Sequence, residues 1–471
     1  MIGPGGFSRN PNRSLPEWSN VRARVTASLT GDWVPIPSVA GVGAGRLSSL
    51  CRTENWILSG AARVALTLVW PGHNVVPMVR DYPFGAPVSL AIDPLLMQLQ
   101  RTEPVSRIRL PFGGEAWLLT RYEDNRSLLV DRRFSRAAAA GPDVPRLTVE
   151  PAGGVAMAIM DPPEHTRLRK LVALAFTASR VQELRPRLAQ LTDALLASMQ
   201  EQGPPADLVR SFSLPLPTMV ICELLGVPYA DRDRFQSQAR RVLSSTAYTR
   251  EQVREAVDEL SDYLMDLIDE RREAPTEDLL SALVHARDAQ DRLTEQELVT
   301  LCGTLLIAGY ENITNSIASF TYLLLTKPAE WERLRADPGL IPAAVEELLR
   351  YAMSGLGVSH ARIAIEDVEF GGVTIRRGDA VFASLPAANH DPDVFADPDM
   401  IDFDRSHNPH LAFGHGIHHC LGAALARAEL QIALASILRR FPRLQLAVPP
   451  HEVPWKIGLT VRGPESLPIT W

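Results

Sequence analysis

The amino-acid sequence predicts an α+β protein that is predominantly helical. Two long segments, 180–200 and 250–272, repeat apolar residues with the spacing of amphipathic helices. Two further segments, 105–120 and 368–384, read as short strands around a Gly-Gly turn. Because mostly helical sequence separates these hairpins, the pattern favours an α+β chain over a regular βαβ alternation.

Composition excludes several classes of protein. The chain has 471 residues, a formal net charge of −7 and a pI near 5.9, which argues against a general nucleic-acid-binding surface. No apolar run reaches the roughly 18 residues of a membrane helix, since Arg63 interrupts the nearest candidate, Trp56–Trp70. The cysteines lie far apart and form no CxxC pair, which indicates a reducing cytoplasm: they are Cys51, Cys222, Cys302 and Cys420.

The first 77 residues differ in texture from residues 78–471. They are rich in turn-forming residues and show no sustained period. We expect a disordered extension, or the product of a start codon assigned too far upstream, with Met78 as the natural start. A small docking or targeting extension is the alternative.

A long buried helix is predicted between Thr294 and Pro328. Thr294 and Glu297 form a T-x-x-E capping box before an apolar run, and no proline follows until Pro328. Such a helix of about 32 residues would be roughly 48 Å long. It is apolar on nearly all sides, yet residues 309–312 read Gly-Tyr-Glu-Asn, so its middle requires a functional explanation.

A second unusual segment, 408–438, carries Cys420 where a glycine-containing loop meets a helix pattern. Gly414 and Gly416 permit a tight backbone path, and the helix N-terminus stabilises a thiolate. Three interpretations compete: a buried structural cysteine, haem-thiolate ligation, and zinc. Zinc would use His415, His418, His419 and Cys420, three of which are consecutive and converge poorly on one tetrahedron.

The ten residues of this loop resemble the haem-binding pattern F-G-x-G-x-H-x-C-x-G of the cytochrome P450 superfamily, soluble bacterial type, without a departure. The resemblance implies a cytochrome P450 fold, with a long central helix over the haem and small β-sheets at one side. It implies haem b with Cys420 as the axial ligand of the iron. It further implies that Phe413 packs near the sulfur, that Gly414 shapes the loop, that His418 bonds a propionate, and that Gly422 lets the helix lie close to the porphyrin.

Other matches extend the resemblance over about residues 78–471. Glu347 and Arg350 fit the family's E-x-x-R, and Arg405 aligns with the arginine that completes a buried structural group.

Three further residues resemble the family's propionate-binding positions. His165 and Arg169 are four apart on one predicted helix face, and Arg362 matches a third position.

The long helix departs from the family at one position. The family pattern A/G-G-x-D/E-T aligns with Ala308, Gly309, Glu311 and Asn312, so asparagine replaces the threonine whose hydroxyl supplies a proton during oxygen activation. Ala308 and Gly309 would leave room for dioxygen, and Glu311 would serve the proton route. Asn312 would position a relaying water, or a substrate hydroxyl would replace the missing group. The blander interpretation has Asn312 bonding only a backbone carbonyl or a core water.

The resemblance implies a monooxygenase that hydroxylates or epoxidises a bulky, mostly apolar secondary metabolite of the macrolide, polyketide or terpenoid class. Oxidative coupling or desaturation without oxygen insertion is the alternative, and a non-catalytic haem sensor or docking protein is an alternative of another class. Segments 135–160 and 235–249 resemble variable lids over the substrate. The predicted pocket residues are Thr304, Leu305, Gly357 and Val358.

Electrons would come from a ferredoxin and its ferredoxin reductase, because no flavin segment is present. A basic patch of Arg167, Lys170, Arg427 and His419 would dock the donor. We expect a cytoplasmic monomer that binds neither membrane nor nucleic acid.

Overall fold

The computed structural model divides the chain into two units, Met1–Pro77 and Met78–Trp471. It describes residues 78–85, 89–150, 156–289, 292–353, 355 and 360–471, and the strands of the first unit. Those strands form an antiparallel sheet in the order β2-β1-β3, within a stretch where no regular period was found. Their bounds are β1 Arg22–Ser28, β2 Val34–Pro35 and β3 Arg63–Val69. Most of the expected extension lies outside the described residues.

The second unit is built around α10, Glu295–Leu325, a helix of 31 residues. Its N-terminus has the predicted capping box: the Thr294 hydroxyl accepts from the Glu297 amide at 3.2 Å, and the Glu297 carboxylate accepts from the Thr294 amide at 2.8 Å. The helix is buried along most of its length, as its apolar sequence predicted.

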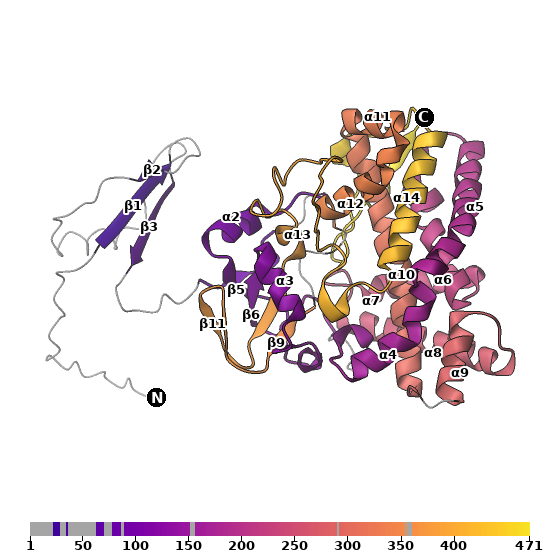
Figure 1. The fold of residues 1–471 in the computed structure, drawn as a ribbon, viewed down its shortest axis with the longest axis horizontal. Coiled ribbons are helices and arrows are strands. Elements are labelled where there is room, and N and C mark those ends of the chain that lie inside the picture. Colours follow the sequence, from indigo (N-terminus) through magenta and orange to yellow (C-terminus); the bar gives the residue numbers. More distant parts are fainter. Residues whose placement is uncertain are drawn as a thin grey trace, which may run out of the picture. The chain divides into compact units, whose positions relative to one another are not determined.

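The other long helices pack around α10, with α14 and α5 side by side on one flank (Figure 1). The two predicted amphipathic segments are confirmed as α5 and α8. The helices around α10 include α5 Ala178–Gln202, α6 Pro215–Leu225, α8 Arg250–Glu273 and α14 Ala423–Arg440. The remaining ones are α2 Pro94–Thr102, α3 Tyr122–Val130, α4 Glu164–Ala173, α7 Arg232–Val242, α9 Leu279–Asp288, α11 Pro328–Ala336, α12 Ile341–Tyr351 and α13 Leu385–Ala388. Among the described residues, none of the helices is long and apolar enough to cross a bilayer.

The strands of the largest sheet gather on the side of β5, β6 and β9, away from α5 (Figure 1). One sheet has the order β4-β5-β6-β12-β9-β7, and β10 pairs only with β11. Both predicted hairpins are present, and β12 continues from the second to pair in parallel with β6. A third sheet has the order β13-β14-β8. The bounds are β4 Arg80–Asp81, β5 Val105–Arg109, β6 Glu115–Leu119, β7 Phe134–Ser135, β8 Ala206–Asp207, β9 Arg362–Ala364, β10 Val368–Phe370, β11 Val373–Ile375, β12 Ala380–Ala383, β13 Gln445–Leu446 and β14 Pro468–Thr470.

Candidate haem and substrate site

The cysteine loop is a tight turn that ends at the N-terminus of α14. The Cys420 amide donates to the Phe413 carbonyl at 2.8 Å, closing the loop. Gly414 and Gly416 have φ of +70° and +71°, conformations that favour glycine. At Gly416 a Cβ atom would also lie 2.7 Å from the Leu129 carbonyl oxygen, so glycine is required there for space as well.

Cys420 is accessible to a small molecule, whereas Cys222 and Cys302 are buried in the core. The protein around Cys420 nevertheless displaces bulk water and raises the pKa of its thiol. A hydrogen bond at the Gly422 backbone and the charges of Arg169 and Arg427 only partly offset this effect. The Gly422 backbone group at the helix terminus does favour the thiolate, as expected, and a coordinated metal would favour it further.

Four basic side chains with unpaired donor atoms meet between α4, β9 and the cysteine loop. We call Arg136, His165, Arg362 and His418 the cation cluster. The His165 and His418 rings lie 4.3 Å apart between centroids. Both terminal nitrogens of Arg362, Nδ1 of His165 and Nε2 of His418 are buried without a hydrogen-bond partner among the described residues.

The two arginines of the cluster concentrate positive charge in a desolvated place, where the two histidines stay neutral. Burial, with repulsion from Arg362, lowers the pKa of Arg136 to about 9, and burial lowers that of Arg362 to about 10. Burial and neighbouring cations lower the pKa of His418 to about 2. The nearby carboxylate of Asp161 accepts from the Ser135 hydroxyl and the Arg136 amide, so it does not satisfy these donors.

These residues fit a haem. Buried donors without acceptors match the two propionates of the porphyrin, since buried carboxylates need charged partners. A Cβ atom at Gly422 would meet nothing within 4 Å, so there is space beside the N-terminus of α14 for a flat group. The described residues gather no group of three or more His, Cys, Asp or Glu side chains for a metal ion, as a zinc site at the loop would require.

The structure adds two details to the propionate prediction. Arg169 donates Nη2 to the carbonyl of His419 at 2.7 Å, so it also supports the cysteine loop, and its contact with a propionate stays a prediction. Arg136 was missed, although it is buried with its Nε unpaired and its Nη1 donating to the Ala158 carbonyl at 2.6 Å. No sequence signal marked it, because it stands alone before an alanine run.

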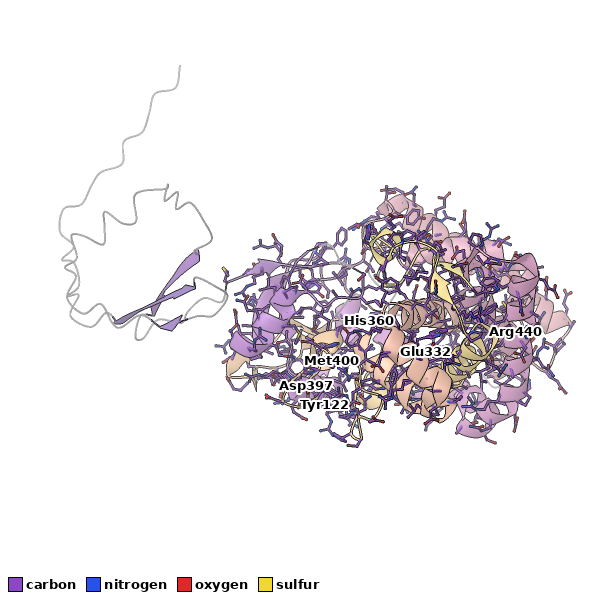
Figure 2. All side chains as sticks on the ribbon, turned by 90° about the horizontal axis from the view of Figure 1, so that it is seen from above. Tyr122, Glu332, His360, Asp397, Met400 and Arg440 are labelled. Atoms are coloured by element: carbon purple, nitrogen blue, oxygen red, sulfur yellow. The ribbon has the colours of Figure 1, made fainter. Side chains whose placement is uncertain are left out.

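The structure joins Glu347, Arg350 and Arg405 as a buried triad. Arg350 donates to Glu347 at 2.7 and 2.9 Å, and Arg405 Nε donates to it at 3.1 Å. The carbonyls of Asn389, Pro398 and Met400 take further Arg350 hydrogens; Met400 is labelled in Figure 2. Burial alone would raise the pKa of Glu347, but the arginines hold it below its usual value.

One face of α10 lines a central cavity of about 560 Å³. Thr304, Ile307, Ala308, Glu311 and Asn312 reach it, at the spacing i, i+3, i+4, i+7 and i+8 of a single helix face. Leu305 was predicted to line the pocket but does not, because its position on α10 turns it into the core, where it is 8% exposed. The predicted pocket residues Gly357 and Val358 lie outside the described residues.

Gly309 also faces away from the cavity. A Cβ atom at this position would lie 2.5 Å from Cδ1 of Ile221 on α6. Glycine is therefore needed for the close approach of α6 and α10, and not to make room for dioxygen as the sequence suggested. Ala308 does line the cavity.

Glu311 is held in a buried ion pair at the cavity wall. Its carboxylate contacts the Lys456 ammonium and accepts from Asn315 Nδ2 at 3.2 Å. Lys456 comes from the C-terminal segment, 145 positions away, and its role could not be inferred from local sequence.

Both expected lids contribute to the cavity. Residues 144–148 come from the first lid, and Val242 and Leu243 come from the second. His360 also lines it, just before β9 (Figure 2). Burial and the charges of Arg136 and Arg362 lower the pKa of His360 to about 4.

The predicted basic patch is weaker than its sequence indicates. Arg167 is paired with Glu297, and Arg427 donates to Glu346 at 2.7 and 2.9 Å. Arg427 also stacks on Phe413, with its guanidinium carbon 4.5 Å from the ring centroid. Lys170 and His419 are exposed.

Comparisons with known proteins agree with this geometry. A family model described as Cytochrome P450 matches residues 95–461. Nocardicin C N-oxygenase of Nocardia uniformis subsp. tsuyamanensis is 53% identical over 393 residues, which cover 83% of this chain and 98% of that enzyme. Mycinamicin IV hydroxylase/epoxidase of Micromonospora griseorubida is 51% identical over 392 residues, with the same coverage of both chains.

A solved structure gives the same result. The crystal structure of cytochrome P450mel 107F1, described as having biaryl coupling reactivity, shares 45% identity at a TM-score of 0.81, and the match covers 84% of this chain and all of that one. Since the family model spans most of the chain and these relatives match nearly their whole length, the chain belongs to the cytochrome P450 family and is a haem-thiolate monooxygenase.

Proposed function

We propose that this enzyme hydroxylates or epoxidises a bulky, mostly apolar secondary metabolite of the macrolide, polyketide or terpenoid class. The observation that carries the proposal is the central cavity, whose walls are largely apolar and whose helix face presents Ala308 and Asn312. The name of one relative, mycinamicin IV hydroxylase/epoxidase, supports hydroxylation or epoxidation, and that of a second, nocardicin C N-oxygenase, supports oxygen transfer to a secondary metabolite.

A binding screen tests this proposal. Secondary metabolites of these three classes are added to the purified haem protein, and the shift of its haem absorption is recorded. We expect a saturable shift with at least one large apolar compound and little shift with small compact ligands. Tight binding of small compact ligands alone would contradict the proposal.

The haem would be held by Cys420 at the iron and by the cation cluster at the propionates. Bound haem supplies the chemistry of the family, the transfer of one oxygen atom from dioxygen to the substrate. Cys420→Ser should abolish the thiolate-type spectrum of the reduced carbon monoxide complex. Cys302→Ser, at a buried cysteine of the core, is the matched control and should retain that spectrum.

Asn312 would orient a water or a substrate hydroxyl at the cavity wall. Its amide donates and accepts hydrogen bonds but does not relay a proton as a hydroxyl does. The adjacent Glu311–Lys456 pair keeps a carboxylate within the same wall. We expect Asn312→Ala to lower the product formed per electron consumed, and Asn312→Thr to keep it closer to the natural enzyme. Unchanged coupling in both variants would reject the role.

Oxidative coupling or desaturation is the second candidate, favoured by the absence of a hydroxyl at position 312 and by the biaryl-coupling relative. Turnover under ¹⁸O₂ separates the two. Hydroxylation or epoxidation places the label in the product, whereas coupling and desaturation leave the product unlabelled.

A ferredoxin, reduced by its ferredoxin reductase, would supply the electrons to a monomeric cytoplasmic enzyme. Lys170 is an exposed cation on α4 and should contribute to docking. Lys170→Glu should weaken donor binding most at low salt, while Arg335→Glu on α11 serves as a control of equal charge change. Equal effects of both variants would contradict docking at α4.

A further inference from the structure

Two side chains of the first lid stand between the central cavity and a second pocket. Arg146 and Glu150 line both. The second pocket, which we call the outer pocket, has a volume of about 660 Å³ and opens to the surface beside the turn that joins β5 to β6. Phe112 and two arginines near the N-terminus of α8, Arg250 and Arg254, also line it.

The charges at this junction do not balance. Arg250 and Arg254 both contact one oxygen of Glu150, at 3.2 and 3.0 Å, so this carboxylate is already shared between two cations. Asp143 adds one further negative charge to the outer pocket. Three arginines therefore meet two carboxylates, and Arg146 is the cation without an ion pair among the described residues.

Arg146 is positioned by neutral groups. Its Nη1 donates to the carbonyls of Pro142 at 2.6 Å and Val144 at 3.2 Å, and its guanidinium carbon lies 5.7 Å from the centroid of the Phe112 ring. Its Nε is buried without a partner among the described residues. Burial, with repulsion from Arg250, lowers the pKa of Arg146, so an added anion would relieve this site.

The surroundings indicate what kind of anion would enter. The rest of the central cavity is mainly apolar, including Leu147, Ile159, Val253 and Ile307. The planar guanidinium offers a fork of donors that matches a carboxylate. An apolar molecule with one carboxylate at its outer end would satisfy both parts of this space.

We propose that the substrate carries a carboxylate and that Arg146 is the residue that selects it. The proposal rests on the proposed function only in taking the central cavity as the substrate site. Arg146 holds the carboxylate at the mouth, where the outer pocket keeps it partly hydrated, and the apolar body extends toward Asn312. Recognition at this end fixes which part of the substrate reaches α10.

Paired probes test the assignment in the haem-loaded protein. Dodecanoate and 1-dodecanol share an apolar chain and differ in charge, and their affinities are measured by calorimetry and by the haem absorption shift. Hydrogen bonds to a charged group predict a preference for the acid of about tenfold or more in the natural protein. Arg146→Gln should abolish that preference and leave dodecanol binding unchanged, and Arg146→Lys should retain part of it.

Arg254→Gln is the matched control. It removes the same charge from the outer pocket, but Arg254 does not line the central cavity. We expect this variant to keep the preference for the acid. A preference that survives in Arg146→Gln, or that disappears equally in Arg254→Gln, would overturn the role of Arg146. Binding of dodecanol without preference for the acid in the natural protein would overturn the carboxylate site alone. Failure of both probes to bind, in a protein whose haem absorption shifts with a large apolar secondary metabolite, would overturn the carboxylate site and leave the proposed function standing.

Discussion

The buried triad and the cation cluster place arginine in the interior in opposite ways. In the triad, Arg350 and Arg405 share the carboxylate of Glu347 and fill their remaining positions with backbone carbonyls. In the cluster, Arg136 and Arg362 repel each other and keep unpaired donor atoms. A network that satisfies itself stabilises the chain alone, whereas one with unpaired donors is completed by something that binds.

The largest expected effect comes from breaking the triad. Glu347→Gln leaves two arginines buried without their carboxylate, which should cost about 3–5 kcal/mol of unfolding free energy. Urea unfolding of the haem-free protein measures it. Glu332→Gln is the control, because Glu332 pairs with Arg335 on the surface of α11 and should change stability by about 0.5 kcal/mol or less (Figure 2). Similar losses of unfolding free energy in Glu347→Gln and Glu332→Gln would contradict the special role of the buried triad.

A buried acid with one oxygen unpaired among the described residues gives a pH-dependent test. Glu429 on α14 is 2% exposed, its Oε2 is unpaired among the described residues, and burial raises its pKa from 4.5 to about 8. Because the folded state holds the proton more tightly, its contribution is complete below pH 4.5 and is lost as the pH rises to 8. The loss approaches roughly 1.4 kcal/mol per pH unit within this window.

Glu429→Gln should remove this dependence, since glutamine remains neutral. Unfolding measured between pH 5 and 9 should therefore show the variant gaining on the natural protein by a few kcal/mol at the alkaline end. Glu452→Gln, at an exposed carboxylate, should leave the slope unchanged. An identical slope in Glu429→Gln would contradict the assignment of a neutral buried acid.

Arg362→Gln should show the opposite of the triad result. Removing a cation from the cluster relieves repulsion, so the haem-free protein should be as stable as the natural one or more stable. Loss of hydrogen bonds to a propionate should weaken haem retention by about 10- to 100-fold, measured as haem transfer to an excess of apo-globin. Arg376→Gln on the surface should change neither property. If Arg362→Gln instead destabilised the haem-free chain, the cluster would stabilise the chain itself, as the triad does, and this prediction would be wrong.

The smallest effect is expected at Arg427, which belongs to neither the triad nor the cation cluster. Arg427 links Glu346 to the Phe413 ring of the cysteine loop. Lysine at 427 keeps the charge but loses the paired hydrogen bonds and the stacking, which should cost about 1 kcal/mol in thermal or urea unfolding. A full loss of haem from this variant would show that Arg427 belongs functionally to the haem cradle.

Most of what could be predicted from the sequence came from short motifs whose residues lie close together along the chain. The capping box gave the start of α10, and the spacing of Glu347 and Arg350 on one helical turn gave the core of the triad. The glycines of the cysteine loop have the positive φ that their pattern indicated.

Contacts between distant segments could not be read in the same way. Arg136 has no neighbouring motif, and Lys456 reaches Glu311 from another part of the chain. The sequence also did not predict which face of α10 points into the cavity, because apolar residues surround the helix and mark no preferred face. That is why Leu305 and Gly309 were assigned to the cavity although they face the core and α6.

The rotation of α10 about its axis determines which of its residues face the cavity, and so which positions suit directed evolution of this enzyme. Thr304, Ile307 and Asn312 face the cavity, so substitutions at these positions would change the shape of the substrate that the enzyme accepts, with little cost to expression. Gly309 is fixed by Ile221, and any larger residue there forces two helices apart before it alters selectivity. A productive library therefore follows the three-and-four spacing along α10, because a scan of consecutive positions would include core-facing residues such as Leu305 and Gly309, where substitutions disturb packing.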